Sequence, residues 1–318
     1  MGKYANKMGN ELLKTGWIFP GQGSQYIGMG KDLYKKSELA RNLCKIADDI
    51  LDFDIKSVVL DGTDEQLNKT KFTQPAIYVT SVILGKILID RGIEPFSVAG
   101  HSLGEYSALT ISNSVSFEKG LELVKVRSES MDIAGKLNGG TMAAIVGLEE
   151  DKVQAICSSY TGEGIVVIAN FNSPNQIVIS GTKDAVFETI KKAKDSGAKL
   201  AIELKVSGAF HSPLMEPARE ALIKIVDSIK FKNPKYLFFN NVDGKNLSDG
   251  QKIKFSLIKQ LEKPVLWTKS ILEMKKYGAE SFLEVGPGKV LQGLNKRIDR
   301  SLISKGVDSL FKIETLNV

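Results

Sequence analysis

The 318-residue sequence predicts an α/β protein with a parallel sheet at its core and a small inserted unit of strands and helices. Two observations predict this class. Short apolar runs that end in glycine-containing turns are interspersed with long helical patterns, as in parallel sheets covered by helices. Between residues 139 and 206 the pattern changes to strand, helix, strand, strand, helix, strand. That change marks a separate unit within the larger one.

The N-terminal half begins with a buried strand. Residues 17–19 are apolar and end at Pro20-Gly21, so a strand and then a loop over residues 21–25 are expected. Residues 74–89 predict a long buried helix, with Pro75 in its first turn. The other elements predicted here are helices up to residue 33 and over residues 43–51, 105–111 and 117–138, and a strand over residues 96–99.

The inserted unit has the β-α-β-β-α-β order of the ferredoxin-like arrangement. Its two middle strands are expected on either side of a polar turn containing Asn172, Pro174 and Asn175. The expected strands are 142–146, 165–169, 176–180 and 199–206, the helices are 149–160 and 182–196, and further core strands follow at 235–240 and 281–285. These elements predict a main domain over residues 14–138 and 207–318, a subdomain over 139–206, and a flexible N-terminal extension over 1–13.

Composition narrows the possible partners and locations. The net charge is +6, but no basic run is interleaved with aromatic residues, so nucleic acid is not an expected partner. The longest apolar run, residues 77–89, is interrupted by Lys86 and is too short to span a bilayer. Cys44 and Cys157 are two isolated cysteines, which indicate a reducing compartment. We therefore expect a cytoplasmic protein, or one in a plastid-type organelle if the source is eukaryotic, without a membrane partner.

A candidate nucleophile lies where a predicted strand meets a predicted helix. The segment Gly100-His101-Ser102-Leu103-Gly104 has the Gly-x-Ser-x-Gly pattern of a nucleophile elbow. Glycines flank such a serine because the tight turn crowds any Cβ there. The pattern alone is weak, and a Gly-Ser turn without chemistry is the alternative. The strand before it and the helix after it favour the catalytic interpretation.

The serine needs a general base, and the chain has only two histidines. His101 is next to Ser102 on a tight turn, where neighbouring side chains point apart. His211 follows a predicted strand, as a catalytic base in an elbow fold should. We therefore expect His211 to be the base, although a lone loop histidine is usually only solvated. No acidic third member is apparent, and two histidines without a cysteine cluster predict no metal site.

Two further groups complete the predicted site. An oxyanion hole needs two N–H donors, and the backbone amides of Leu103 and Gln22 are the candidates. Arg127 lies in a helix that is substantially apolar, where a guanidinium group suits a carboxylate with bidentate geometry. A surface charge is the ordinary interpretation of a helical arginine. We also expect Gln22, His101 and Met131 to contact the substrate.

Taken together, the motifs of this sequence resemble those of a known family. The motifs in common are Phe19 to Gln25 (FPGQGSQ), Gly100 to Tyr106 (GHSLGEY), Arg127, Gly208 to His211 (GAFH) and Gln260. In this order they resemble the malonyl-CoA:acyl carrier protein transacylases of type II fatty-acid synthesis. The resemblance extends from Trp17 to about Gly293. It implies an α/β-hydrolase-like core with a ferredoxin-like subdomain.

The resemblance also implies the chemistry. It makes Ser102 the nucleophile and His211 the base, with Gln260 orienting His211 through its side-chain carbonyl. Arg127 would bind the free carboxylate of the malonyl group. The substrates would be malonyl-CoA and the phosphopantetheine arm of acyl carrier protein, with no cofactor and with the enzyme as a monomer. Ala209-Phe210-His211 resembles the malonyl-selecting sequence of polyketide synthase acyltransferases, although Gly208 departs from it.

Three alternatives remain open from the sequence. A serine esterase or thioesterase would use the same Ser102–His211 pair, but its pocket has no need of a carboxylate-binding arginine. A polyketide-type acyltransferase is a related possibility, although Gly208 departs from the residue often found in those domains. A non-catalytic carrier-docking subunit is disfavoured because Ser102, His211, Arg127 and Gln260 are all present.

Overall fold

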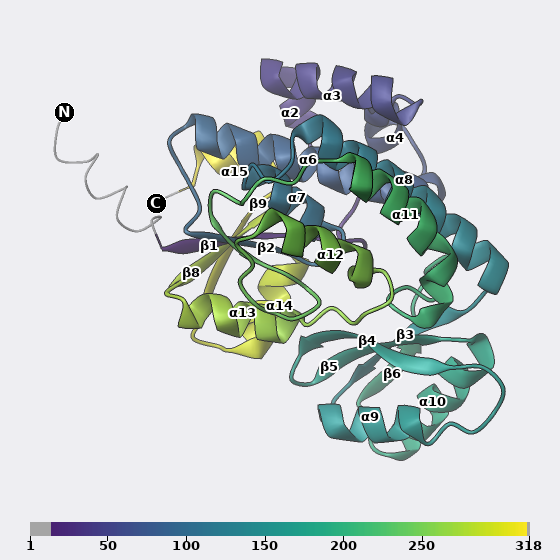
Figure 1. The fold of residues 1–318 in the computed structure, drawn as a ribbon. Helices are drawn as coiled ribbons and strands as arrows, with labels where there is room; N and C mark the ends of the chain where they lie inside the picture. The colour runs from purple at the N-terminus through teal and green to yellow at the C-terminus, as the bar shows by residue number, and fades with distance from the viewer. Residues whose placement is uncertain (1–13, 317–318) are drawn as a thin grey trace.

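The computed structural model describes residues 14–316, and the extension expected over residues 1–13 lies outside them. The described chain forms two β-sheets with associated helices (Figure 1). One sheet is parallel and the other is a smaller antiparallel sheet. The predicted α/β class with two sheets is therefore confirmed.

The parallel sheet has the order β7-β2-β1-β8-β9. Counted along the chain this is 3-2-1-4-5, so the order reverses at β1. In open parallel sheets of this kind, ligands bind beyond the carboxyl ends of the strands near that reversal. The strands are β1 (Thr15–Phe19), β2 (Ser97–Gly100), β7 (Leu237–Phe239), β8 (Ser281–Val285) and β9 (Ile303–Val307).

Both faces of the parallel sheet are buried at strands β1 and β2, which explains why these strands do not alternate between apolar and polar residues. The edge strand β9 is largely exposed. Trp17 and Phe19 of β1 point into one hydrophobic cluster, whereas Ile18 between them points into another. Figure 1 shows the helices that cover the two faces, with α6, α7 and α8 on one side and α13 and α14 on the other. They are α6 (Thr70–Asp90), α7 (Gly104–Ile111), α8 (Phe117–Asn138), α13 (Trp267–Lys276) and α14 (Val290–Ile298).

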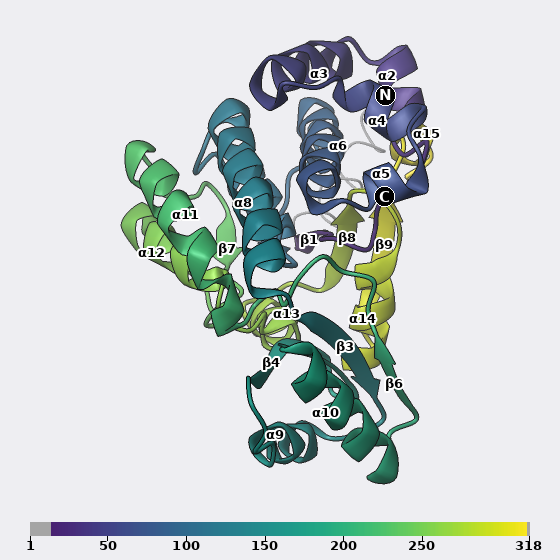
Figure 2. The same ribbon diagram turned by 90° about the vertical axis from the view of Figure 1, so that its right-hand side faces the viewer.

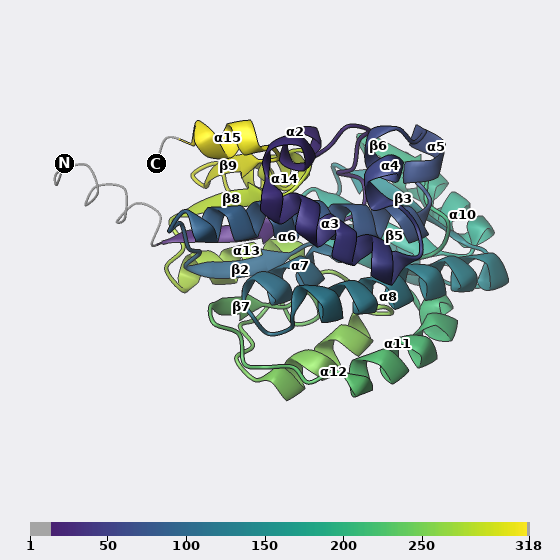
Figure 3. The same ribbon diagram turned by 90° about the horizontal axis from the view of Figure 1, so that it is seen from above.

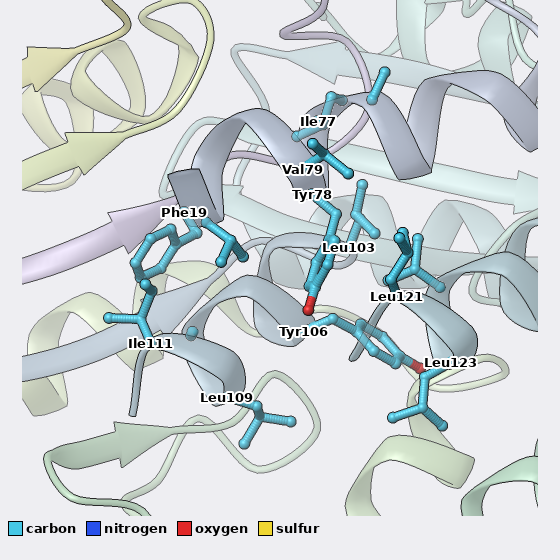
Figure 4. Close-up of a cluster of buried hydrophobic side chains, with 14 of the residues drawn as sticks. Phe19, Ile77, Tyr78, Val79, Leu103, Tyr106, Leu109, Ile111, Leu121 and Leu123 are labelled. Atoms are coloured by element: carbon cyan, nitrogen blue, oxygen red, sulfur yellow. The ribbon is translucent and has the colours of Figure 1, made fainter. Parts of the chain in front are cut away.

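The larger hydrophobic cluster packs helices α6, α7 and α8 against one another. Figure 4 shows Tyr78 of α6 and Tyr106 of α7 among the aliphatic side chains of this cluster. The Tyr78 hydroxyl lies 2.8 Å from Thr110 Oγ1 and donates to Phe117 O over 2.9 Å. These hydrogen bonds tie α6 to α7 and to the start of α8.

Helix α6 begins four residues before the predicted start, and this corrects the placement of Pro75. Pro75 lies in the second turn of Thr70–Asp90, not the first. The prediction failed because Thr70, Lys71 and Thr73 are polar, although Thr70 and Thr73 are buried in the fold. The helix is long and apolar enough to cross a membrane, but 83% of its apolar window is buried inside the structure. Its apolar composition therefore reflects its position in the core.

The small sheet has the strand order β4-β5-β3-β6, and all its pairings are antiparallel. Its two helices cover the face that points away from the parallel sheet (Figures 1 and 2). On the opposite face, Met142, Ala169 and Val178 join the larger hydrophobic cluster. The elements are β3 (Thr141–Val146), α9 (Glu150–Ser158), β4 (Val166–Ser173), β5 (Gln176–Gly181), α10 (Lys183–Asp195) and β6 (Leu200–Glu203). The predicted β-α-β-β-α-β order is confirmed.

One boundary in this unit differs from the prediction. Strand β4 continues to Ser173, so Asn172 lies on the strand and only Pro174 and Asn175 form the turn. The polar side chains near the end of β4 suggested a loop, but Asn170, Asn172 and Ser173 are buried. They are buried because this end of β4 packs against the segment around Val265 and against helices α13 and α14.

Backbone hydrogen bonds join strand β4 of the small sheet to the segment that precedes α13 in the larger unit. Phe171 N donates to Val265 O over 2.9 Å, and Val265 N donates to Ala169 O over 2.8 Å. Figure 3 shows β9 and β7 at opposite edges of the parallel sheet, with α15 beside β9 and α11 and α12 beside β7. The remaining elements are α2 (Lys31–Lys36), α3 (Glu38–Leu51), α4 (Ile55–Leu60), α5 (Asp64–Leu67), the 3-10 helix η1 (Pro213–Met215), α11 (Glu216–Ser228), α12 (Gly250–Gln260) and α15 (Leu310–Glu314).

Candidate active site

Ser102 lies in a strained turn between β2 and α7. Its φ angle is +50°, in the left-handed region that few non-glycine residues adopt. A Cβ on Gly100 would lie 1.8 Å from the carbonyl carbon of Gly104, and one on Gly104 would lie 2.0 Å from Phe19 O. The crowding predicted for the flanking glycines is therefore present. Such strain at a serine is typical of a site where the hydroxyl must be held outward.

His211 meets Ser102 from the segment that follows the small sheet. Its Nε2 lies 2.8 Å from Ser102 Oγ, and its φ angle of +56° is also left-handed. Its Nδ1 lies 2.8 Å from the backbone carbonyl oxygen of Gln260. Burial, with a contribution from the positive charge of Arg127, lowers the pKa of His211 to about 3. The ring is therefore neutral at ordinary pH, and Nε2 is free to accept the serine proton when Nδ1 donates to Gln260.

Gln260 contacts His211 differently from the expectation. The resemblance implied that the side-chain carbonyl orients the ring, but the backbone carbonyl does so. The side chain instead accepts from Arg127 Nη2 at Oε1 over 3.1 Å, and its Nε2 donates to Ser102 O over 3.0 Å. Gln260 ends α12, so its carbonyl is one of those left without a partner inside the helix. That free carbonyl explains why the backbone takes the role.

Arg127 is wholly buried on α8 and points at the serine. Its Nη2 lies 3.0 Å from Ser102 Oγ, and its Nη1 donates to Gln74 Oε1 over 2.7 Å. The guanidinium also lies 5.4 Å from the centre of the Tyr106 ring, as a cation over an aromatic face. Burial lowers the pKa of Arg127, but an arginine keeps its charge in proteins. The site therefore holds a cation beside the candidate nucleophile.

The other predicted site residues line one cavity with Ser102, His211 and Arg127. Its volume is about 180 Å³, and it lies between the carboxyl ends of the parallel strands and the small sheet. The residues that the prediction placed there are Gln22, His101, Leu103 and Met131. Gln260 lies behind the cavity wall. Gly21 brings its loop against the elbow, since a Cβ there would lie 2.4 Å from His101 O.

Four residues near the site were not predicted. Gln74 accepts from Arg127, and Asn172 Oδ1 lies 2.8 Å from His101 Nε2. Glu105 and Asn241 form a buried network with Gln260, and both are wholly shielded from solvent. One signal was present in the sequence: Glu105 is a charged residue in an otherwise uncharged helix, directly after the elbow. The other three have no local signal in the sequence.

Among residues 14–316, no group of three His, Cys, Asp or Glu side chains that could hold a metal ion occurs.

The comparison with protein families identifies the class. Residues 16–306 match the family model of the acyl transferase domain. The chain is therefore an acyltransferase by family, and the strand–serine–helix turn with its buried histidine is the part of the fold suited to carry the acyl group.

Individual relatives narrow the class further. Malonyl CoA-acyl carrier protein transacylase of Bacillus subtilis (strain 168) is 41% identical over 304 residues, which are 95% of this chain and 96% of that protein. The crystal structure of an acyl carrier protein S-malonyltransferase from Vibrio cholerae has a TM-score of 0.92 and 39% identity, covering 96% of this chain and 100% of that one. A malonyl-transacylase in complex with a type II PKS acyl-carrier protein has a TM-score of 0.91 and 37% identity, and the match covers 95% of this chain and 98% of that one. The chain belongs to the malonyl CoA-acyl carrier protein transacylase family.

Proposed function

We propose that this enzyme transfers the malonyl group of malonyl-CoA to the phosphopantetheine thiol of an acyl carrier protein, through a malonyl ester of Ser102. One observation carries the proposal beyond family membership. Ser102 Oγ lies 2.8 Å from a neutral histidine nitrogen and 3.0 Å from a buried guanidinium nitrogen. A nucleophile, its base and a cation for a free carboxylate thus meet at one oxygen. Supply of malonyl groups for fatty-acid synthesis is the role that follows.

In the first half-reaction, His211 Nε2 takes the proton of Ser102 as Oγ bonds to the thioester carbon. The carbon–sulfur bond then breaks, and CoA leaves with the proton that His211 returns. In the second half, the carrier thiol gives its proton to His211 and its sulfur attacks the malonyl ester. The bond to Oγ breaks and the proton returns to Ser102. The Gln260 carbonyl holds the ring in position throughout.

Two backbone amides are suited to stabilise the oxyanion of each half-reaction. Gln22 and Leu103 line the cavity beside Ser102. Among the hydrogen bonds of the described residues, neither amide donates to a protein acceptor. Each is therefore available to an oxyanion held 2.7–3.1 Å away, which is the range for such donors.

Arg127 is proposed to select the malonyl group. A malonyl carboxylate would accept from the guanidinium, which donates to the Gln74 and Gln260 oxygens that hold it in place. A charged pair of this kind in a buried site contributes about 2–4 kcal/mol, which disfavours acetyl groups. Met131 accepts from Gln74 Nε2 at 3.6 Å and so borders this subsite, while His101 borders it from the elbow.

Further points of organisation belong to the same proposal. Residues 14–138 and 207–318 would form the catalytic domain and residues 139–206 a ferredoxin-like subdomain. The hydrolase-like description of the larger unit rests on the strand–serine–helix turn. The protein is proposed to work as a cytoplasmic monomer without a cofactor, a location supported by two free, buried cysteines.

The decisive experiment is the intact mass of the 34.8 kDa chain after incubation with malonyl-CoA. We expect one added malonyl group that is lost on addition of phosphopantetheinylated carrier protein. Ser102→Ala should abolish the addition. Ser107→Ala is the control, because Ser107 is a buried serine of α7 outside the elbow turn and its hydroxyl has no partner among the described residues. Rapid release of free malonate instead of transfer would identify a thioesterase.

A further inference from the structure

Glu105 is a buried carboxyl group next to the catalytic turn that the proposed reaction does not use. It lies one residue after Gly104 on α7, with no exposed surface. Burying a carboxyl group is costly unless its oxygens are hydrogen-bonded. Its Oε2 accepts from Gln260 Nε2 over 2.7 Å and from the backbone nitrogen of Asn241 over 3.1 Å. Among the described residues, its Oε1 has no partner.

Each of the two donors leads to the reacting groups. Gln260 accepts from Arg127 at its side-chain oxygen and meets His211 at its backbone oxygen. Asn241 Oδ1 accepts from the backbone nitrogen of Ser102 over 2.7 Å, and its Nδ2 donates to Gly100 O over 2.6 Å. Glu105 Oε2 therefore holds both Gln260, which contacts the base His211, and Asn241, which contacts the elbow at Ser102 and Gly100.

Glu105 also helps to fix the orientation of the Gln260 side-chain amide. The Nε2 group faces three acceptors, which are Glu105 Oε2, Ser102 O at 3.0 Å and Asn241 Oδ1 at 3.3 Å. A reversed amide would set its oxygen against those acceptors and its NH₂ group against the Arg127 donor. The Glu105 contact is the shortest of the three. A hydrogen-bond acceptor at position 105 would give the Gln260 amide the same orientation whether that acceptor is charged or neutral.

We propose that Glu105 is a positioning residue for acyl transfer, whose Oε2 fixes Gln260 and Asn241 and through them His211, Arg127 and Ser102. This inference rests on the proposed function. Glu105 touches none of the reacting atoms, so it acts only through its two partners. The competing view is that Glu105 merely fills a buried position.

The kinetic test compares Glu105→Met, which keeps length and volume without an oxygen, with Glu105→Gln, which keeps an acceptor. The methionine variant should lose about tenfold in kcat/KM for malonyl-CoA and part of its preference over acetyl-CoA, because Arg127 and the base are no longer held. The glutamine variant should restore kcat/KM to within about threefold of the parent. If the methionine variant does not fold, Glu105→Ala replaces it.

Glu284→Gln is the control, because Glu284 is a second buried carboxyl group that accepts from Leu291 N, Gln292 N and Gln292 Nε2 and has no contact with this network. Its kinetics should match the parent. Equal losses in the methionine and glutamine variants, or no loss in either, would overturn the proposal.

A second readout does not depend on activity. The chain has only two histidines, so ¹⁵N spectra of the imidazole groups report on His101 and His211 separately. Glu105→Met should shift the Nδ1 signal of His211, while Glu105→Gln and Glu284→Gln should leave it unchanged. An unshifted His211 signal in folded Glu105→Met would overturn the proposal. Absence of malonyl loading in the parent protein would instead contradict the proposed function.

Discussion

At the scale of single residues, the protonation state of His211 is decided by its surroundings. Its ring is buried beside a guanidinium group, and both burial and that positive charge disfavour the imidazolium form. A base must be unprotonated to accept the serine proton. A histidine with an ordinary pKa of 6.5 would lose this form as the pH falls below that value.

We therefore predict an acid-tolerant first half-reaction. With the pKa of His211 lowered to about 3, the neutral base persists between pH 7.5 and about 5. The rate of malonyl-enzyme formation should stay nearly constant over that range. Rapid quenching with intact-mass detection measures it, and circular dichroism at each pH checks folding. A decline with a midpoint near 6.5 would contradict the prediction.

Arg127 carries the second prediction at this scale. Arg127→Ala should reduce malonyl loading by at least about thirtyfold, because the free carboxylate loses its partner. Loading of uncharged acyl groups should fall far less, so the malonyl-to-acetyl ratio decreases. Arg219→Ala is the control, since Arg219 is a half-buried arginine that forms ion pairs with Glu216 and Glu262, away from Ser102. Unchanged selectivity in the Arg127 variant would remove its assigned role.

At the scale of elements, the elbow depends on how closely β1, β2 and α7 approach one another. Gly104 opens α7 against the carbonyl oxygen of Phe19, the last residue of β1. The glycines of the motif were predictable from the crowding of the turn itself. The contact with β1 was not, because Phe19 is distant in sequence.

Gly104→Ala should therefore destabilise the protein by about 1–3 kcal/mol and displace Ser102. A Cβ there would lie 2.0 Å from Phe19 O, so the helix start must shift. Urea unfolding measures the change. Gly293→Ala provides the comparison, because Gly293 lies in helix α14 with no heavy atom within 4 Å of an added Cβ. That variant should be neutral or slightly more stable. Equal stability of both variants would contradict the prediction.

Element boundaries failed where burial overrode polarity. Asn172 looks like a loop residue by type, yet it lies on β4 and is buried beside the cavity. Similarly, α6 begins at Thr70 rather than near Gln74, because the polar residues Thr70 and Thr73 of its first turn are buried. A single sequence does not record which polar residues will find partners in the interior.

At the scale of the whole molecule, the active site is closed by both sheets. The parallel sheet supplies Ser102, and the small sheet supplies Asn172, whose Oδ1 lies 2.8 Å from His101 Nε2. Strand β4 is also joined, through Val265, to the segment that precedes α13. The small unit therefore forms part of the wall of the cavity beside Ser102, in addition to being a separate set of strands.

Asn172→Ala should lower kcat/KM for malonyl-CoA several-fold and stability by about 1–2 kcal/mol, because His101 loses its buried partner. Asn175→Ala, in the exposed turn of the same hairpin, should change neither. Steady-state kinetics and thermal unfolding measure both variants. Equal behaviour of the two variants would show that the contact between Asn172 and His101 is unimportant.

The sequence by itself indicated the family and the two-sheet α/β class, and it singled out Ser102, His211 and Arg127 as candidate site residues. It did so because the elbow motif, the scarcity of histidines and an arginine in an apolar helix are local features. Only the tertiary structure decided which Gln260 oxygen meets His211, and that Glu105 and Asn241 stand behind the site. Those contacts join residues 49 to 158 positions apart, and their partners depend on packing that no local pattern records.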